Sequence, residues 1–533
     1  MKKAFLFSVF CISIQIQKVY TQAPLIEWEK SIGGTETDLT SDVIETIDGG
    51  FILVGSTRSL DGDVTINNGN GDVWIVKLNS AGIIQWQKAL GGSENDAASS
   101  VGFTSDGGYI VAGSSASNNG DVTNHHGSSF YHDYWVVKLD STGTIEWQKS
   151  LGGTDDEGAN SVQQTQDGGY IVGGYSKSTD GDVSGHHGNA GTEDYWILKL
   201  NSNGAVQWQK SLGGENVDSP HSIIQILEGG YIVAGSSHST DGDITGNHGG
   251  EDSWIVKLDV NGIIQWQNAF GGTSDERSNS IQQTADRGFI IVGNSYSADG
   301  DLAGIHPASN DADIWVLKLD SMGSIQWQKC YGGTRLELGY SICQTNDGGY
   351  VFGAITQSND GDVVGFHEPI GNFNLDSWVV KLDSIGNMQW QKPLGGTSSE
   401  LSYSLKQTLD GGYIVANSSG SNDGDVTGHH GAAGYGLYDF WIVKLSGIVG
   451  IEEQNPNTTL SLYPNPTQGQ LFIQSNTKGK ALVMVYDAMG KLVLEQSCFN
   501  QEYLDIRGFS KGLYMLKYTT EEGSSVQRFV VGE

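Results

Sequence analysis

One unit of 58 to 63 residues is written seven times along most of this 533-residue chain. Each unit contains the motif Trp-x-(Lys/Asn)-x-x-Gly-Gly, which starts at Trp28, Trp86, Trp147, Trp208, Trp266, Trp327 and Trp390. A second motif, Asp-x-Trp-(Ile/Val)-(Val/Leu)-Lys-Leu, places tryptophan at Trp74, Trp135, Trp196, Trp254, Trp315, Trp378 and Trp441. The two sets account for all 14 tryptophans. A repeat of this length predicts an array of similar supersecondary units that bury their apolar faces against one another.

Each unit is interpreted as four short strands. In the third unit, the polar segment 161–165 precedes the turn sequence Asp167-Gly168-Gly169, in which glycine supplies the positive φ of a tight hairpin. The apolar segment 170–173, a long polar loop, segment 195–200 and a final segment 205–210 complete the unit. Four antiparallel strands per unit, repeated seven times, predict an all-β fold with a seven-bladed β-propeller.

The two ends of the repeat region complement each other. The region opens with an isolated fourth strand around Trp28 and closes with the first three strands of a unit, which end near Leu445. We therefore expect the propeller, residues 24–445, to be closed by its own N-terminal strand. An open solenoid is the alternative, but it would leave both ends unpaired and would require polar caps that the sequence lacks.

The N-terminus has the pattern of an export signal. Lys2 and Lys3 precede an apolar stretch, 4–16, that is too short to span a bilayer, and small or polar residues follow it. We expect residues 1–23 to be a signal peptide, no transmembrane segment in the mature chain, and a monomer. Only three cysteines remain after cleavage, so packing rather than a disulfide framework must stabilise the fold.

The composition changes after the repeats. Residues 446–458 are interpreted as a linker, and residues 459–533 as a second domain of alternating apolar strands separated by Asn, Gly and Asp turns. The segment Tyr463-Pro464-Asn465-Pro466, the pair Gly490-Lys491 and the later Gly512-Leu-Tyr514 occur in it in that order.

This order resembles the type A C-terminal sorting domain of the Bacteroidota type IX secretion system. The resemblance implies an Ig-like β-sandwich that interacts with the secretion machinery. It also implies a protein secreted to the outside or attached to the outer surface of the outer membrane. An ordinary structural Ig-like domain is the alternative.

Acidic residues recur at four positions of the unit, and the formal net charge is −33. One acid follows the Gly-Gly pair by four residues, two form Asp-Gly-Asp, and one precedes the Asp-x-Trp tryptophan. Strand order places the Gly-Gly acids and the Asp-Gly-Asp loops at one rim. This acidity, without a basic stripe, argues against nucleic acid as a partner.

Calcium is one interpretation of these acids. The spacing of two sets resembles the oxygen ligands of an EF-hand-type loop, although the bidentate Glu is missing: Asp61, Asp63 and Asp72, and Asp241, Asp243 and Asp252. The alternative is that Asp-Gly-Asp forms turns through side-chain-to-backbone hydrogen bonds, while the other acids pair with the repeated lysines such as Lys77. For the loop histidines, zinc would need three or four convergent ligands, so we expect surface side chains instead.

A unique ligand site is expected where the units differ. The long loops differ in their aromatic residues, which are Phe130, Tyr131, Phe366, Phe373, Tyr435 and Tyr438. Exposed aromatics on a polar rim are stacking platforms for a glycan or anchors for a cell-surface protein, but they can equally pack the loops. We therefore expect a non-catalytic binding, adhesion or structural propeller without catalytic residues. The alternative is a polysaccharide-active hydrolase or lyase on the loop face.

Overall fold

The computed structural model describes residues 22–189, 191–302, 311–367, 374–431, 437–447, 460–467, 469–475, 480–487, 492–499, 502–520 and 523–532. Every regular element in these ranges is a β-strand. No helix in these ranges is long and apolar enough to cross a membrane. The expected signal peptide, apart from its last two residues, and most of the expected linker lie outside the described residues.

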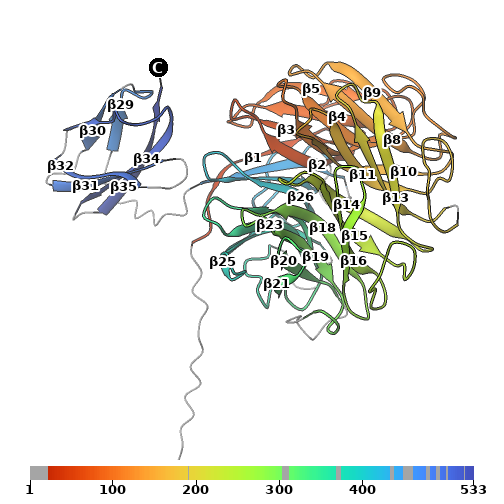
Figure 1. Ribbon diagram of the computed structural model, residues 1–533. Helices are drawn as coiled ribbons and strands as arrows, with labels where there is room; N and C mark the ends of the chain where they lie inside the picture. The colour runs from red at the N-terminus through yellow and green to blue at the C-terminus, as the bar shows by residue number, and fades with distance from the viewer. Residues whose placement is uncertain are drawn as a thin grey trace, which may run out of the picture.

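The repeat region forms seven four-stranded antiparallel sheets, here called blades 1 to 7 (Figure 1). Blades 1 to 3 consist of β2 (Asp38–Glu45), β3 (Phe51–Thr57), β4 (Asp72–Leu78), β5 (Ile84–Leu90); β6 (Asp96–Phe103), β7 (Tyr109–Ser115), β8 (Asp133–Leu139), β9 (Ile145–Leu151); and β10 (Glu157–Gln164), β11 (Tyr170–Ser176), β12 (Asp194–Leu200), β13 (Val206–Leu212). Blades 4 to 6 consist of β14 (Asp218–Gln225), β15 (Tyr231–Ser237), β16 (Asp252–Leu258), β17 (Ile264–Phe270); β18 (Glu276–Gln283), β19 (Phe289–Ser295), β20 (Asp313–Leu319), β21 (Ile325–Tyr331); and β22 (Glu337–Gln344), β23 (Tyr350–Thr356), β24 (Asp376–Leu382), β25 (Met388–Leu394).

Blade 7 confirms the predicted closure. It consists of β26 (Glu400–Gln407), β27 (Tyr413–Ser419), β28 (Asp439–Leu445) and the N-terminal strand β1 (Ile26–Ile32). Strand β1 pairs antiparallel with β28, with Lys30 opposite Ile442. The last blade therefore takes strands from both ends of the repeat region, and β1 supplies the fourth strand that blade 7 would otherwise lack.

The propeller core lies between neighbouring blades. Seven apolar clusters are present, one for each junction, and the cluster between blades 7 and 1 joins Phe51 and Trp74 to Phe440. The tryptophans of the Asp-x-Trp motif lie on the third strands and are fully buried. Those of the other motif lie on the fourth strands and pack edge-on or tilted against an aromatic residue of the next blade, as Trp147 does against Tyr170 with ring centroids 5.5 Å apart.

The C-terminal domain is a two-sheet sandwich. One sheet has the order β29 (Leu460–Tyr463), β30 (Gln470–Ser475), β33 (Glu502–Asp505), and the other β32 (Leu492–Phe499), β31 (Lys480–Asp487), β34 (Gly512–Thr520), β35 (Gly523–Val531). Its core is one apolar cluster that includes Leu471, Val483 and Phe529. This confirms the predicted all-β fold of two parts.

Candidate functional site in the central channel

A β-bulge occurs at the same position of every first strand. The register of each first strand against the second shifts by one residue, for example between Ala159 and Ser161. The bulged residues are Ser41, Ser99, Asn160, His221, Asn279, Tyr340 and Tyr403. An extra residue breaks the alternation of side chains, so the bulged residue and the residue after it both face the central channel.

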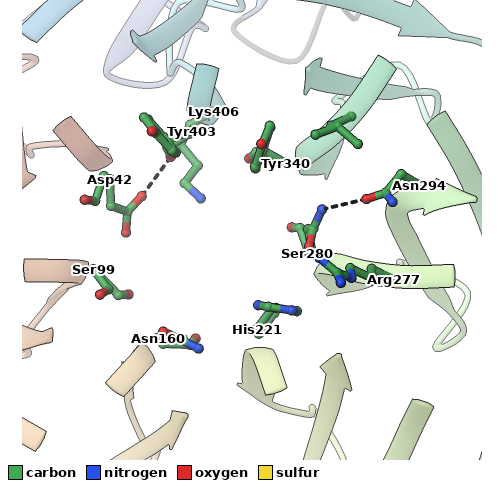
Figure 2. A pocket seen from close by; sticks show the side chains of 18 of the residues that line it. Asp42, Ser99, Asn160, His221, Arg277, Ser280, Asn294, Tyr340, Tyr403 and Lys406 are labelled. Carbon is green, nitrogen blue, oxygen red and sulfur yellow. Dashed lines mark hydrogen bonds between the residues drawn. The ribbon is translucent and has the colours of Figure 1, made fainter. Parts of the chain in front are cut away.

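The channel is a cavity of about 580 Å³, and its wall differs from one side to the other. Figure 2 shows Tyr340, Tyr403 and Lys406 on one side and Asn160 and His221 on the other. The rings of Tyr340 and Tyr403 meet edge to face, with centroids 5.8 Å apart. The wall thus combines an aromatic surface with amide, imidazole and hydroxyl groups, which is the lining of a site for a polar ligand with an apolar face.

The charges of the channel are few and unequal. Arg277 donates from Nε to the buried carboxylate of Glu251 at 2.5 Å, and this ion pair neutralises the charge of Arg277. Lys406 has no carboxylate within ion-pair distance among the residues that the structure describes. Burial lowers the pKa of His221, so its imidazole is uncharged at neutral pH. Burial also raises the pKa of Tyr403 to about 12 and that of Tyr340 above its usual value, so both are phenols.

A ring of hydrogen bonds holds the residues that follow the bulges. At six junctions a backbone N–H of one blade donates to a side chain of the blade before it: Val101 to Asp42 (3.1 Å), Val162 to Ser100 (3.3 Å), Ile223 to Ser161 (3.2 Å), Ile281 to Ser222 (3.4 Å), Ile342 to Ser280 (3.4 Å) and Leu405 to Ser341 (3.2 Å). The seventh junction uses Ser404, whose hydroxyl donates to Asp42 at 2.7 Å. These hydrogen bonds link the first strands of neighbouring blades all around the channel and so hold the channel wall in place.

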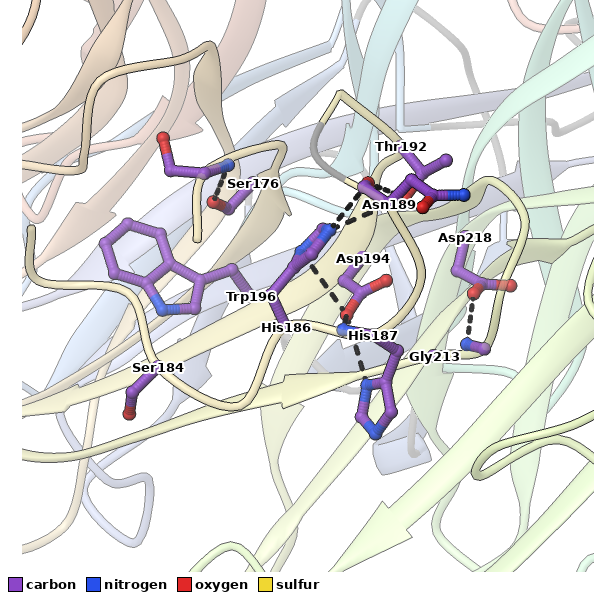
Figure 3. Close-up of polar contacts among 12 residues, drawn as sticks. Ser176, Ser184, His186, His187, Asn189, Thr192, Asp194, Trp196, Gly213 and Asp218 are labelled. Carbon is purple, nitrogen blue, oxygen red and sulfur yellow. Dashed lines mark hydrogen bonds and ion pairs between the residues drawn. The ribbon is translucent and has the colours of Figure 1, made fainter. Parts of the chain in front are cut away.

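The Gly-Gly acids lie buried at the blade junctions. Asp218 accepts hydrogen bonds from Gly214 N (2.8 Å) and Ser239 Oγ (3.0 Å), and Asp194 of the preceding blade lies beside it (Figure 3). A Cβ at Gly213 would stand 2.6 Å from Asp218 Oδ2 and 2.7 Å from Asp194 Oδ1. Only glycine therefore fits between the two carboxylates, which explains the first glycine of the repeated pair.

Burial perturbs these acids in the same direction. It raises the pKa of Asp218 to about 6 and of Glu157, Glu337 and Glu400 to about 7, against the opposing effect of their hydrogen bonds. None of these four residues lines the channel. Their shifted pKa values therefore follow from burial at the blade junctions and do not mark residues of the channel site.

The carboxylates of the six residues predicted to bind calcium accept hydrogen bonds from several different backbone and side-chain donors. Asp61 accepts from Thr35 N and Thr35 Oγ1, both at 2.8 Å, and Asp241 accepts from Glu215 N at 2.9 Å. Asp63 and Asp243 accept from Gly33 N and Gly213 N, both at 3.3 Å. Asp72 accepts from Asn68 N at 2.6 Å, and Asp252 from His248 N at 2.9 Å. Across the described ranges, no group of three or more His, Cys, Asp or Glu side chains is placed to hold a metal ion. The hydrogen bonds are those of the side-chain-to-backbone alternative, and calcium binding stays a prediction.

The alternative to calcium also paired the repeated lysines with the Gly-Gly acids and the Asp-x-Trp acids, and that pairing is wrong. Lys77 instead binds Asp48 at 3.1 Å, in the first-hairpin turn of its own blade, and Lys199, Lys318, Lys381 and Lys444 bind the equivalent turn acids. The turn acid is the nearer carboxylate because strands two and three are adjacent in the sheet, and strand pairing brings the end of one beside the start of the other.

The expectation that the loop histidines are surface side chains is wrong for His125, His186 and His429, whose side chains are only 1–2% exposed, whereas the second histidine of each pair keeps 30–33% of its side chain exposed. His186 is buried, with Nδ1 3.5 Å from Asp194 Oδ2. The half-buried His187 donates its backbone N–H to the same oxygen at 2.6 Å (Figure 3). Its Nε2 lies 3.7 Å from Asp243 Oδ2 of the next blade. His126, His248, His367 and His430 bridge two blades in the same way. Histidine suits this bridge because its two ring nitrogens point in opposite directions.

The aromatic residues predicted to bind ligand are separated. Phe130 is 89% exposed and Tyr131 41%, both in blade 2. Phe366 is half-buried in blade 6, where it lines a small cavity with Thr334 and Arg335. Tyr438 is half-buried, and its charge interaction with Tyr403 adds to the raised pKa of the latter. Phe373 and Tyr435 lie outside the described residues.

Sequence reasoning missed the channel residues. The signal was present, because the third residue after each Gly-Gly acid varies from Ser to Asn, His and Tyr, while the residue that follows it is serine in six of the seven units. What hid it was the bulge, which simple strand alternation does not predict.

The sorting-motif residues that the structure describes lie in the sandwich. The ring of Tyr463 packs at a tilt against Phe472 with centroids 4.9 Å apart, and both Tyr463–Pro464 and Asn465–Pro466 are cis peptides. Asn465 Oδ1 accepts from Val530 N at 2.8 Å, and the Tyr514 hydroxyl donates to Ser510 O at 2.9 Å. Gly512 begins β34. Gly490 and Lys491 lie outside the described residues.

Comparison with known proteins identifies the C-terminal domain. Residues 461–532 match the secretion system C-terminal sorting domain family. The chain is a β-propeller with a type IX secretion C-terminal sorting domain, which sends it to the cell surface or outside the cell and implies interaction with the type IX machinery.

The chain has a distant curated relative. It is 26% identical over 226 residues to the regulatory protein FlaEY of Caulobacter vibrioides, a match that covers 40% of this chain and 23% of FlaEY. Among solved structures, a fungal alcohol oxidase of the AA5 family in complex with copper is 13% identical with a TM-score of 0.42, over 96% of this chain and all of that one. The Neurospora crassa Pan2 WD40 domain is 10% identical with a TM-score of 0.40, over 78% and 95%. At these values the activities of those proteins are not carried to this chain, and the propeller assignment rests on its own strand pairing.

Proposed function

We propose that this exported propeller is a non-catalytic binding module whose central channel holds a carbohydrate. The observation that carries the proposal is the unequal channel wall. Tyr340 and Tyr403 form an aromatic surface, and Asn160 and His221 face it across the channel. Sugars present an apolar ring face and a rim of hydroxyls, which such a wall complements.

The sevenfold repeat itself supports a site in the channel. Repeated polar side chains already have partners within their own repeat unit. Asp218 accepts hydrogen bonds from Gly214 and Ser239, and Lys77 forms an ion pair with Asp48. The bulged residues are the positions where the blades differ while sharing one cavity. A single asymmetric ligand therefore finds different partners around the channel, which seven equal positions would not offer.

The alternative, a polysaccharide-active enzyme, gains no specific support. Glycoside hydrolysis uses two carboxyl groups that flank the scissile bond in different environments. The carboxylate described in the channel is Asp42, and both of its oxygens already accept hydrogen bonds.

A glycan array probed with the full chain and its variants tests the proposal. We expect binding to one glycan class, and a loss of about tenfold or more in affinity for Tyr403→Ala and Tyr340→Ala, because aromatic stacking contributes that much at a carbohydrate face. Tyr503→Ala, an exposed tyrosine of the sandwich, is the matched control and should bind as the parent does.

Three outcomes would contradict the proposal. If Phe130→Ala or Tyr131→Ala abolishes binding while Tyr403→Ala does not, the ligand sits on the loop rim. If the array gives no binding and a cell-surface protein is retained instead, the ligand is not a glycan. If the bound glycans are cleaved, with reducing ends released over time, the module is catalytic.

A further inference from the structure

The hairpin turns on the side of the propeller opposite the Asp-Gly-Asp loops are fastened between blades. The second residue of each turn donates its N–H to the side chain that ends the first strand of the next blade. The six such bonds run from Ser105 to Gln164 (2.7 Å), Gln166 to Gln225 (2.8 Å), Leu227 to Gln283 (2.8 Å), Ala285 to Gln344 (2.9 Å), Asn346 to Gln407 (2.9 Å) and Leu409 to Glu45 (2.7 Å). We call each of these bonds a turn clamp.

The junction between blades 1 and 2 lacks the turn clamp. Phe103 occupies the position of the glutamine or glutamate, and its phenyl ring cannot accept the hydrogen bond. The N–H of Ile47, which corresponds to the donor, has no partner among the described residues. The side chain of Ile47 is 88% exposed.

A pocket of about 470 Å³ lies at this junction. Its aromatic wall consists of Trp86, Phe103 and Tyr109, with ring centroids 5.6 Å apart for Phe103 and Tyr109 and 6.2 Å apart for Trp86 and Tyr109. A tryptophan beside an aromatic residue recurs at every junction, as in Trp208 and Tyr231. This junction differs from the others in having Phe103, where the other junctions have the glutamine or glutamate that accepts the turn clamp.

The polar groups of the pocket indicate the charge of its ligand. Its two charged lining residues, Asp48 and Lys77, are paired with each other at 3.1 Å, so the pocket carries no unpaired charge. The carboxamide of Gln85 and the hydroxyl of Ser141 line it and have no partner in the described part of the chain. With the Ile47 N–H, they supply free donors and acceptors beside an aromatic wall.

We propose that this pocket is a second binding site, for a neutral sugar ring stacked on Phe103 and Trp86. Its ring face contacts the aromatic wall, and its hydroxyls bond to the free groups at Ile47, Gln85 and Ser141. A charged ligand would find its counter-ion already taken by the Asp48–Lys77 pair. The site is separate from the central channel and does not depend on a ligand being bound there.

Fluorine NMR of the full chain labelled with fluorotryptophan tests this site. The Trp86 resonance is assigned with the Trp86→Phe variant, and the probes are maltose, cellobiose, xylobiose and diacetylchitobiose, with digalacturonate as the charged comparison. Each is added to about 10 mM, which covers weak millimolar sites. We expect a saturable shift of the Trp86 resonance with at least one neutral disaccharide and a weaker response to digalacturonate.

Two variants of Phe103 then separate the site from the fold. Phe103→Gln restores the repeated residue and the turn clamp, so it should abolish the Trp86 response while the melting temperature stays equal or rises. Phe103→Leu keeps an apolar side chain without the aromatic face and should weaken binding about tenfold. If Phe103→Gln does not fold, Phe103→Leu decides the question alone.

The result that would overturn the site is a Trp86 resonance unmoved by every neutral disaccharide, or moved equally in the parent and in both Phe103 variants. A response to digalacturonate stronger than that to the neutral sugars would overturn the assigned ligand class. Loss of glycan binding in Tyr403→Ala with the Trp86 response intact would show that the channel and this pocket are independent. The two proposals can therefore fail separately.

Discussion

The hydroxyl of Ser404 donates to Asp42 at 2.7 Å, and this bond joins the innermost strands of the last and first blades. Asp42 stands where the other six blades have serine. Its carboxylate also accepts from the N–H groups of Val43 at 2.9 Å and Val101 at 3.1 Å. The chain therefore closes twice, by β1 at the outer edge of blade 7 and by Asp42 at the channel.

We expect Asp42→Ala to destabilise the propeller by about 2 kcal/mol, because three donors lose their acceptor and the N–H of Val101 is left without a partner. Urea unfolding followed by tryptophan fluorescence measures the effect, and it reports on the propeller alone because all 14 tryptophans lie there. Ser100→Ala, which removes one ring acceptor, is the control and should cost less. Equal losses in the two variants would show that closure places no special demand on Asp42.

Stability should fall as pH rises through neutrality. Burial raises the pKa of Glu400 from 4.5 to about 7, so the unfolded chain releases this proton at lower pH than the folded chain. The stabilisation is complete below about pH 4.5 and is lost as pH rises through about 7, on the order of 3 kcal/mol for one such group. Glu157 and Glu337 act in the same direction.

Glu400→Gln should therefore flatten this pH dependence, since a carboxamide keeps an acceptor for Gly396 N–H and carries no proton to lose. The free energy of unfolding, measured at about pH 5 and about pH 8, should differ less in the variant than in the parent. Glu36→Gln, at an exposed glutamate of the same kind of loop, is the control and should leave the difference unchanged. A slope that Glu400→Gln does not alter would refute the assignment.

Gly213→Ala should destabilise the junction of blades 3 and 4 by about 1–3 kcal/mol. Its Cβ would stand 2.6 Å from Asp218 and 2.7 Å from Asp194, and two buried carboxylates would have to move. Gly71→Ala is the matched control, because the nearest atoms to its Cβ lie at 3.5 Å. Equal melting temperatures of the two variants would contradict this explanation of the repeated glycine.

Removal of divalent cations should leave the melting temperature unchanged. Asp61 and Asp241 already accept hydrogen bonds from the neighbouring Gly-Gly loop, and Asp72 and Asp252 accept from their own loops. The comparison is thermal unfolding with EDTA and with added calcium. A rise with calcium that Asp241→Asn abolishes would instead support the EF-hand-like interpretation.

The repeat made much of the fold predictable. Trp28 without preceding strands and Leu445 without a following one indicated that β1 would complete blade 7, and the pairing of β1 with β28 confirms it. Which basic residue each acid pairs with could not be predicted from the sequence. Lys77 could reach several acids by sequence, and only the adjacency of two strands selected Asp48.

The sequence by itself determined the blades, their number, their closure and the export domain, because each depends on patterns written in consecutive residues and repeated. The tertiary structure alone decided which side chains share a space. A one-residue bulge turned Asn160, His221, Tyr340 and Tyr403 toward one channel, and the substitution at Phe103 opened a pocket against Trp86 of another blade. These contacts join residues of different blades, far apart in the chain. Their positions follow from sheet register and blade packing, which the pattern of any single unit does not encode.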